Sequence, residues 1–301
     1  MSKFRLRGRR RRNRESRPDR VPLRTMVPNL ITSLAACGGI SAIAICATNY
    51  AKTLAGQEVV ARDWGHGFLA LLIACVCDAM DGRVARMLKC SSKLGAELDS
   101  LADFVNFGVA PAMFMYFWVL AGGVEMVDGH LVQTIPLLVR RLMLVAALFY
   151  SMCDAFRLAR FNTMLEQPTL PYWKHYFLGV PAPGGCWMVL TPLLLARSID
   201  GVNSVMLHPG MAIGMLIFVG VLMASRIPTV SLKALRISKA ARLPTLVGCL
   251  LLIACFITNL WLTLGVIGAL YILTVPVVVM MFLHGKSKYL RENAGASQEG
   301  N

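Results

Sequence analysis

The fold is decided by one polar stretch between two apolar blocks, residues 78–103, which reads DAMDGRVARMLKCSSKLGAELDSLAD. Eleven uncharged residues stand directly before it at 67–77, and a mostly apolar run follows it at 104–120. A charged side chain at the centre of a membrane helix costs roughly 2.5–3.5 kcal/mol on an insertion scale, and such residues are functional by default. The four aspartates of this stretch are therefore the first candidates for a functional site.

The composition of the whole chain is that of a membrane protein. The chain has 301 residues, of which 56% are hydrophobic and 16% charged, whereas a soluble domain has about 45–50% apolar and about 25% charged residues. These values exclude a disordered chain, a disulfide-knotted mini-protein and a collagen-like fibre. The nine cysteines form no paired CxxC motifs, so neither a zinc site nor a disulfide framework is indicated.

Eight stretches are long and apolar enough to cross about 30 Å of hydrocarbon, which takes about 20 helical residues. They are residues 27–49, 66–89, 97–120, 137–161, 176–196, 205–224, 244–263 and 264–284. Because exposed strand edges are not tolerated in lipid, we predict an all-α fold: a polytopic integral membrane helical bundle with about eight transmembrane helices.

The net charge of +15 is unevenly spread along the chain. Residues 1–24 hold eleven basic and two acidic residues, and further basic clusters follow the second and sixth predicted spans, whereas 121–135 has no Lys or Arg. The positive-inside rule then places both termini on the cytoplasmic side of the inner (cytoplasmic) membrane. We interpret 1–24 as a disordered Arg-rich cytoplasmic tail held to anionic lipid, not as a nucleic-acid site, and 286–301 as a cytoplasmic C-terminal tail.

The aspartates of the opening stretch form two pairs. Asp78 and Asp81 are three residues apart, and Asp99 and Asp103 are four apart, so each pair shares a helix face. A short connector at 90–95 makes the two helices antiparallel neighbours, and the four carboxylates can converge on one cavity. Like charges this close need a cation, and hard oxygen ligands suit Mg²⁺ or Mn²⁺. The alternative, helix-end charges paired with nearby Arg and Lys, explains a single Asp better than two pairs.

The same stretch matches D-x2-D-G-x2-A-R-x8-G-x3-D-x3-D at every fixed position, the signature of the CDP-alcohol phosphatidyltransferase family. The chain resembles these membrane enzymes of phospholipid synthesis over 78–103, and its helical layout extends the resemblance over most of its length. The resemblance implies the family's fold, a homodimer, and transfer of a phosphatidyl group from CDP-diacylglycerol to an alcohol. It makes 25–285 a transmembrane catalytic domain.

Three further stretches resemble the phosphatidylserine synthase branch of the family. They are DSLADFVNFGVAPA at 99–112, RLARFN at 157–162 and GVPAP at 179–183. This resemblance implies that L-serine is the acceptor and that its hydroxyl attacks the CDP-diacylglycerol phosphate with metal assistance. The products would be phosphatidylserine and CMP.

The resemblance also implies roles for individual residues. The ligands of two metal ions would be Asp78, Asp81, Asp99 and Asp103, with Asp99 and Asp103 also catalytic and Asp103 the candidate base. The CDP moiety would be held by Gly82, Ala85, Arg86 and Gly95, with Asn29 and Thr32 reaching its phosphates. The serine acceptor would contact Asn106, Arg157, Arg160 and Asn162. Other interpretations are helix capping after Pro28 for Asn29 and Thr32, and lipid anchoring for the arginines.

Two other functions compete with transfer to serine. The same family chemistry could use glycerol 3-phosphate or an inositol phosphate, which would demand more cationic residues in the pocket. An ion transporter could use intramembrane carboxylates, but transporters usually show repeated halves or paired broken helices, and this sequence has neither.

Overall fold

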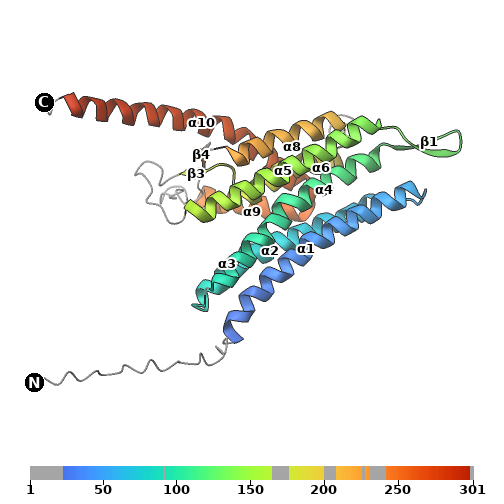
Figure 1. The fold of residues 1–301 in the computed structure, drawn as a ribbon, viewed down its shortest axis with the longest axis horizontal. Helices are drawn as coiled ribbons and strands as arrows, with labels where there is room; N and C mark the ends of the chain where they lie inside the picture. The colour runs from blue at the N-terminus through green and yellow to red at the C-terminus, as the bar shows by residue number, and fades with distance from the viewer. Residues whose placement is uncertain are drawn as a thin grey trace, which may run out of the picture.

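The computed structural model describes residues 23–90, 92–164, 176–199, 208–225, 228–230 and 242–298. Nearly all of the predicted tail at 1–24 lies outside these residues. The helices, drawn in Figure 1, are α1 (Leu23–Leu54), α2 (Ala61–Met87), α3 (Lys93–Asp103), the π-helix η1 (Phe104–Val109), α4 (Ala110–Gly122), α5 (Leu137–Met164), α6 (Ala182–Ser198), α8 (Pro209–Ala224), α9 (Arg242–Thr258) and α10 (Leu260–Gln298). The strands are β1 (Val124–Val127), β2 (His130–Gln133), β3 (Tyr176–Leu178) and β4 (Pro228–Val230).

Four helical stretches in the described part of the chain are long and apolar enough to cross a membrane: Met26–Leu54, Lys93–Gly122, Leu137–Thr163 and Leu260–Met280. The second of these joins α3, η1 and α4 into one continuous span. Two shorter apolar helices, α8 and α9, accompany them. The predicted multi-pass, all-α membrane bundle is thereby confirmed, and the number of about eight spans stays a prediction.

The fifth predicted span begins later than expected. Residues 176–196 are predicted as one span, but β3 occupies the start of this range and α6 begins only at Ala182. Gly179 has a φ of 78°, and Pro181 directly precedes the helix. A left-handed glycine followed by a proline turns the chain before a helix can start.

The boundary between the last two predicted spans, 244–263 and 264–284, lies earlier than expected. Helix α9 ends at Thr258 and α10 begins at Leu260, with Asn259 between them. The side-chain Oδ1 of Asn259 accepts a hydrogen bond of 3.2 Å from the backbone N–H of Leu262, which caps the start of α10. From there α10 continues to its end without a break, so residues 286–298 are helical although the sequence predicts a tail. Lys, Leu, Arg, Glu and Ala in this segment are good helix formers.

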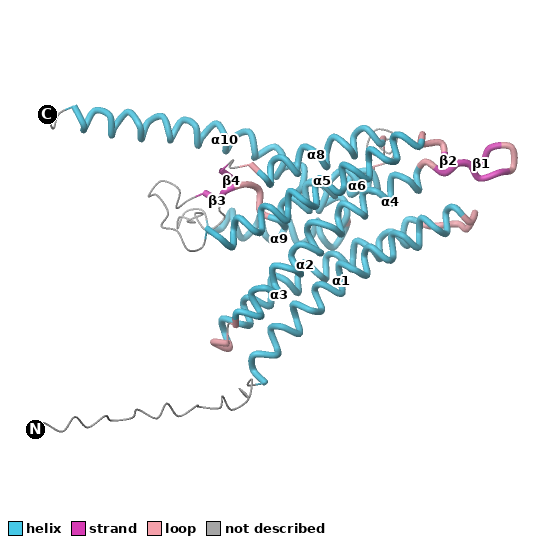
Figure 2. Tube along the Cα trace, in the orientation of Figure 1, coloured by secondary structure: helices cyan, strands magenta, loops and turns pink. Residues whose placement is uncertain are grey.

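The strands form two short antiparallel pairs outside the candidate spans. In the β1–β2 hairpin Val127 pairs with His130, and the turn residues Asp128 and Gly129 have φ values of 51° and 80°. Positive φ at both central residues is typical of the tight turns that match the twist of a hairpin. Figure 2 shows this hairpin at one end of the bundle, with the α2–α3 connection and the β3–β4 pair toward the other.

Small residues let α1 pack closely along α2. A Cβ atom added to Gly38 of α1 would lie 2.9 Å from the Cβ of Ala74 and 3.1 Å from the carbonyl oxygen of Ala70. A Cβ on Gly67 of α2 would likewise lie 3.2 Å from Sγ of Cys46. Small residues at helix contacts allow such close approach in membrane proteins. The contact sets the position of the first helix relative to the acidic end of α2.

The π-helix η1 lies directly after Asp103 and is fastened to α5. The phenolic hydroxyl of Tyr150 donates to the carbonyl oxygen of Phe107 at 2.8 Å, and the hydroxyl of Ser151 donates to that of Gly108 at 3.0 Å. A π-turn widens the helix and frees backbone carbonyls, and such turns are frequent at functional sites. These bonds fix α5 against the helix that carries Asp99 and Asp103.

We expect Gly38→Ala to destabilise the protein, because the added methyl group has no room beside α2. Overpacking of this kind costs about 1–3 kcal/mol, so the melting temperature in detergent should fall. Gly214→Ala in α8 is the matched control, since a Cβ there meets no atom within 4 Å and alanine is the better helix former. Equal melting temperatures for the two variants would contradict the close α1–α2 contact.

Candidate active site

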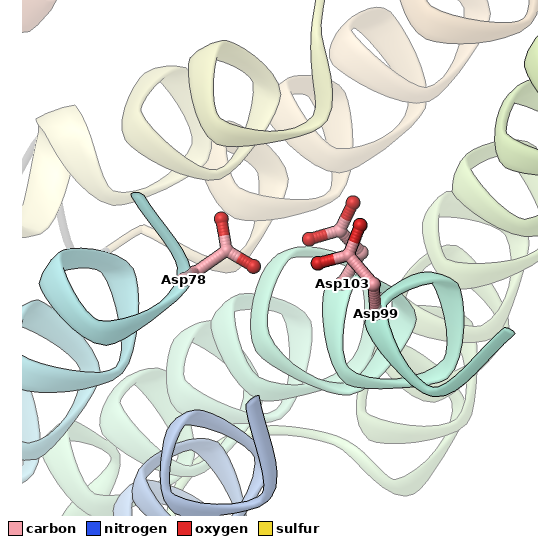
Figure 3. A group of neighbouring side chains, drawn as sticks. All are labelled: Asp78, Asp99 and Asp103. Atoms are coloured by element: carbon pink, nitrogen blue, oxygen red, sulfur yellow. The ribbon is translucent and has the colours of Figure 1, made fainter. Parts of the chain in front are cut away.

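Three carboxylates converge where the end of α2 meets α3. One oxygen atom each of Asp78, Asp99 and Asp103 lies within 4.8 Å of the other two. Figure 3 shows Asp99 and Asp103 side by side on one helix, with Asp78 reaching toward them from the other. Asp78 and Asp103 are half-buried and Asp99 is more exposed. The convergence that the sequence spacing predicts is therefore present for three of the four aspartates.

The fourth aspartate, Asp81, turns toward α1. Its side chain is 3% exposed, and its carboxylate accepts a hydrogen bond of 2.5 Å from the hydroxyl of Thr32 and another from the backbone N–H of Gly82. Asp81 thus lies outside the group of three, because the neighbouring helix supplies it with a donor. Its role as a metal ligand stays a prediction, which requires the carboxylate to turn away from Thr32.

The N-terminal half of α1 closes one side of the site. Pro28 lies inside α1, which begins at Leu23, so the interpretation of Asn29 and Thr32 as capping residues after Pro28 is wrong. The side-chain oxygen of Asn29 lies against Gly95, where an added Cβ would be 2.9 Å away. The absence of a side chain at Gly95 therefore brings α1 next to the first turn of α3.

The last turns of α2 are open to solvent, as a ligand-binding surface requires. Gly82 and Arg86 are exposed, and a Cβ on Gly82 would meet no atom within 4 Å. The guanidinium Nε of Arg86 donates to the carbonyl oxygen of Gly82 at 3.0 Å, and Ala85 between them is half-buried. The predicted contacts of these residues with a nucleotide stay predictions.

Arg160 of α5 caps the end of α8. Its guanidinium donates to the carbonyl oxygens of Ala224 at 2.9 Å and Ser225 at 3.0 Å, with a longer contact of 3.5 Å to that of Met223. Unpaired carbonyls at a helix C-terminus are common targets of arginine. These bonds give Arg160 a structural role that the sequence does not predict, and they leave its predicted contact with serine without support.

The other residues predicted near the acceptor lie in different places. Asn162 donates to the hydroxyl of Ser100 at 3.0 Å, which ties the end of α5 to α3 beside Asp99. Asn106 is fully buried, and its amide oxygen occupies the space that a side chain at Gly39 of α1 would need. Asn106 therefore packs between helices, and its predicted contact with the acceptor stays a prediction.

Arg157 lies inside the bundle with a partner that sequence reasoning missed. Its Nη1 is 3.8 Å from Oδ1 of Asp154, which is fully buried one turn earlier on α5. The signal was present in the sequence, because Asp154 is an acidic residue inside an apolar span, three residues before an arginine. An apolar cavity inside the bundle is lined in part by Cys75, Phe107 and Cys186.

This arrangement of residues agrees with the comparison to known proteins. Residues 25–221 match the CDP-alcohol phosphatidyltransferase family, and residues 240–276 match a family described as CDP-alcohol phosphatidyltransferase 2. The chain belongs to the CDP-alcohol phosphatidyltransferase family. The family predicted from residues 78–103 is therefore confirmed.

Several curated relatives bear the name CDP-diacylglycerol–serine O-phosphatidyltransferase. The chain is 34% identical to the Mycobacterium leprae (strain TN) protein over 171 residues, which are 56% of this chain and 47% of the relative. It is 34% identical to the Helicobacter pylori (strain J99) protein over 205 residues, 67% of this chain and 70% of the relative. It is 38% identical to the Bacillus subtilis (strain 168) protein over 135 residues, which are 43% of this chain and 64% of the relative. The chain spans about half the length of the mycobacterial relatives that it matches.

The three converging carboxylates of this family member fit a divalent cation. Oxygen ligands in this number suit Mg²⁺ or Mn²⁺, which also keep positions open for water or a phosphate. We expect Asp103→Asn to weaken Mn²⁺ binding at least about 10-fold, since changes around metal ligands typically cost 10–100-fold. Isothermal titration of the purified protein with MnCl₂ measures this. Asp128→Asn, in the exposed hairpin turn, is the matched control and should bind Mn²⁺ normally.

The capping role of Arg160 gives a separate prediction. We expect Arg160→Lys to lower the melting temperature in the absence of substrate, because an ammonium group cannot span several carbonyls as a guanidinium does. The lost hydrogen bonds should cost about 1–3 kcal/mol. Arg141→Lys, at an exposed position of α5, should melt like the unaltered protein. An unchanged melting temperature for Arg160→Lys would exclude the capping role.

Proposed function

We propose that this chain is a CDP-diacylglycerol–serine O-phosphatidyltransferase, which makes phosphatidylserine and CMP. The observation that carries the proposal is the convergence of Asp78, Asp99 and Asp103 within 4.8 Å, at the signature of a family of phosphatidyltransferases. The names of the relatives support serine as the acceptor.

In this proposal the aspartates hold divalent cations, and Asp103 also accepts the proton of the serine hydroxyl. Asp78, Asp81, Asp99 and Asp103 would hold two ions, Mg²⁺ or Mn²⁺, which when bound neutralise the charge of a diphosphate and of the leaving phosphate. The carboxylate of Asp103 accepts the proton of the serine hydroxyl as that oxygen forms its bond to phosphorus. The bond from phosphorus to the CMP oxygen breaks, and CMP leaves.

The substrate CDP-diacylglycerol would lie across the end of α2. The exposed turn from Gly82 to Arg86 leaves room for the CDP moiety, and Arg86 can offer a cation to its phosphates. Asn29 of α1 lies against Gly95 of α3, and Thr32, one turn after Asn29, hydrogen-bonds to Asp81 of α2.

The charged residues of α5 help to identify the acceptor alcohol. A dianionic acceptor such as glycerol 3-phosphate would require several cations. The guanidinium of Arg160 caps α8, whereas Arg157 lies inside the bundle with a half-buried guanidinium. A single cation, Arg157, with a neighbouring anion, Asp154, favours an acceptor that carries one positive and one negative charge. Serine is such a zwitterion.

We also propose a location and an assembly for the enzyme. The active site and both termini would face the cytoplasm from the inner (cytoplasmic) membrane, because basic residues gather near the acidic site at the end of α2 and basic connectors face the cytoplasm. The family resemblance supports a homodimer, with membrane lipids as the surroundings and no nucleic acid as a partner.

The decisive experiment supplies purified protein with CDP-diacylglycerol, labelled L-serine and Mn²⁺ or Mg²⁺. We expect CMP release that needs both serine and the metal. Asp99→Asn should reduce turnover roughly 100-fold or more, as the loss of a group that stabilises charge in the transition state does. The control Asp128→Asn should keep normal turnover.

The same assay contains the results that would contradict the proposal. CMP release with glycerol 3-phosphate but not with serine would show that the acceptor is wrong. Absence of transfer to any alcohol in the presence of metal would exclude the transferase function.

A further inference from the structure

A buried pair of opposite charges lies on one face of α5. Asp154 and Arg157 are one helical turn apart, with 3.8 Å between Oδ1 and Nη1. The side chain of Asp154 is 0% exposed and that of Arg157 is 14% exposed. Hydrogen bonds between nitrogen and oxygen are about 2.7–3.2 Å long, so the two groups attract each other without forming one.

The described part of the chain leaves the polar atoms of this pair unsatisfied. Both carboxylate oxygens of Asp154 and Nη1 of Arg157 are buried and have no hydrogen-bond partner among the described residues. A buried polar group without a partner costs about 1–3 kcal/mol, and a charged one costs more. Such a cost is tolerated where a ligand completes the site, because strained or unsatisfied groups cluster at functional positions.

The pair lies next to the carboxylate group of the active site. Asp154 and Arg157 both lie close enough to Asp103 for an electrostatic interaction with it. Oδ2 of Asp154 packs against η1, where a Cβ on Gly108 would be 2.7 Å from it. Because η1 follows Asp103 directly, the pair and Asp103 are held by the same stretch of helix, and we infer that a small molecule bound at Asp103 extends toward the pair.

An amino acid carries the complementary charges on a single carbon atom. Its ammonium group has three N–H donors for a carboxylate, and its carboxylate accepts from a guanidinium, in charge-assisted bonds that are stronger than neutral ones. We propose that Asp154 binds the α-ammonium group and Arg157 the α-carboxylate of an amino-acid acceptor, which directs the side-chain hydroxyl toward Asp103. This inference rests on the proposed function and adds the subsite that selects a zwitterion.

A simpler role for Asp154 would be to hold Arg157 in place. The two roles differ in their response to an acceptor without an amino group. The compound 3-hydroxypropanoate keeps the hydroxyl and the carboxylate of serine and lacks only the ammonium group. If Asp154 only positions Arg157, its loss weakens both acceptors equally, whereas an ammonium-binding Asp154 matters for serine alone.

The experiment compares kcat/KM for L-serine and 3-hydroxypropanoate in the unaltered enzyme and in Asp154→Asn, at saturating CDP-diacylglycerol and Mn²⁺. We expect the variant to lose roughly 30-fold or more in kcat/KM for serine, as the loss of a buried charged hydrogen bond does. Its kcat/KM for 3-hydroxypropanoate should change less than about 3-fold. The control Asp128→Asn, in the hairpin turn, should match the unaltered enzyme with both acceptors. Equal losses for the two acceptors, or no loss for serine, would overturn the proposal.

A second measurement uses the unaltered protein and does not depend on the folding of a variant. L-serine should raise the melting temperature, because a ligand that binds only the folded state stabilises it. At the same concentration 3-hydroxypropanoate and ethanolamine, which each lack one of the two charges, should raise it less. Equal stabilisation by 3-hydroxypropanoate and serine would exclude the ammonium site.

These results also separate this proposal from the proposed function. If serine stabilises the protein as expected but no CMP is released with any alcohol, the amino-acid site stands and the transferase function fails. If serine is transferred but Asp154→Asn affects both acceptors alike, the function stands and the ammonium site fails.

Discussion

A carboxylate inside a membrane helix needs a partner, because removing an isolated charge from water costs several kcal/mol even after the protein relaxes. Two of the aspartates have such a partner among the described residues. Asp81 accepts hydrogen bonds from Thr32 and the backbone, and Asp154 lies beside Arg157. The three aspartates that converge on one point instead repel one another unless a cation joins them.

The surrounding helices are arranged so that these partners meet. Gly38 brings α1 close to α2, and Thr32 lies on the same helix, within hydrogen-bond distance of Asp81. Ser151 fastens α5 to η1, and Asp154 follows three residues later. Close helix packing in this protein therefore places polar groups as much as it buries apolar surface.

The sequence was sufficient for the features that depend on local spacing. The i,i+3 and i,i+4 aspartates and the short connector predicted the convergence of carboxylates, and the apolar blocks predicted the membrane bundle. Features that depend on a distant helix were not predictable from spacing. The turn of Asp81 toward Thr32 and the capping of α8 by Arg160 both involve a partner on another element. Asp154 and Arg157 are an i,i+3 pair inside the predicted span 137–161, so their proximity could have been predicted from spacing and was missed.

The π-helix sets the angular phase between the two halves of one long span. Each residue of an α-helix turns the chain by about 100°, so the extra residue of a π-turn offsets the faces of α3 and α4 by about that angle. The half before η1 can present Asp99 and Asp103 to α2, while the half after it keeps Phe114 fully buried in the aromatic core with Phe68. Because Phe68 also lies on α2, a single transmembrane segment keeps both its acidic half and its aromatic half against the same neighbour, without a break in the helix that would expose its backbone to lipid.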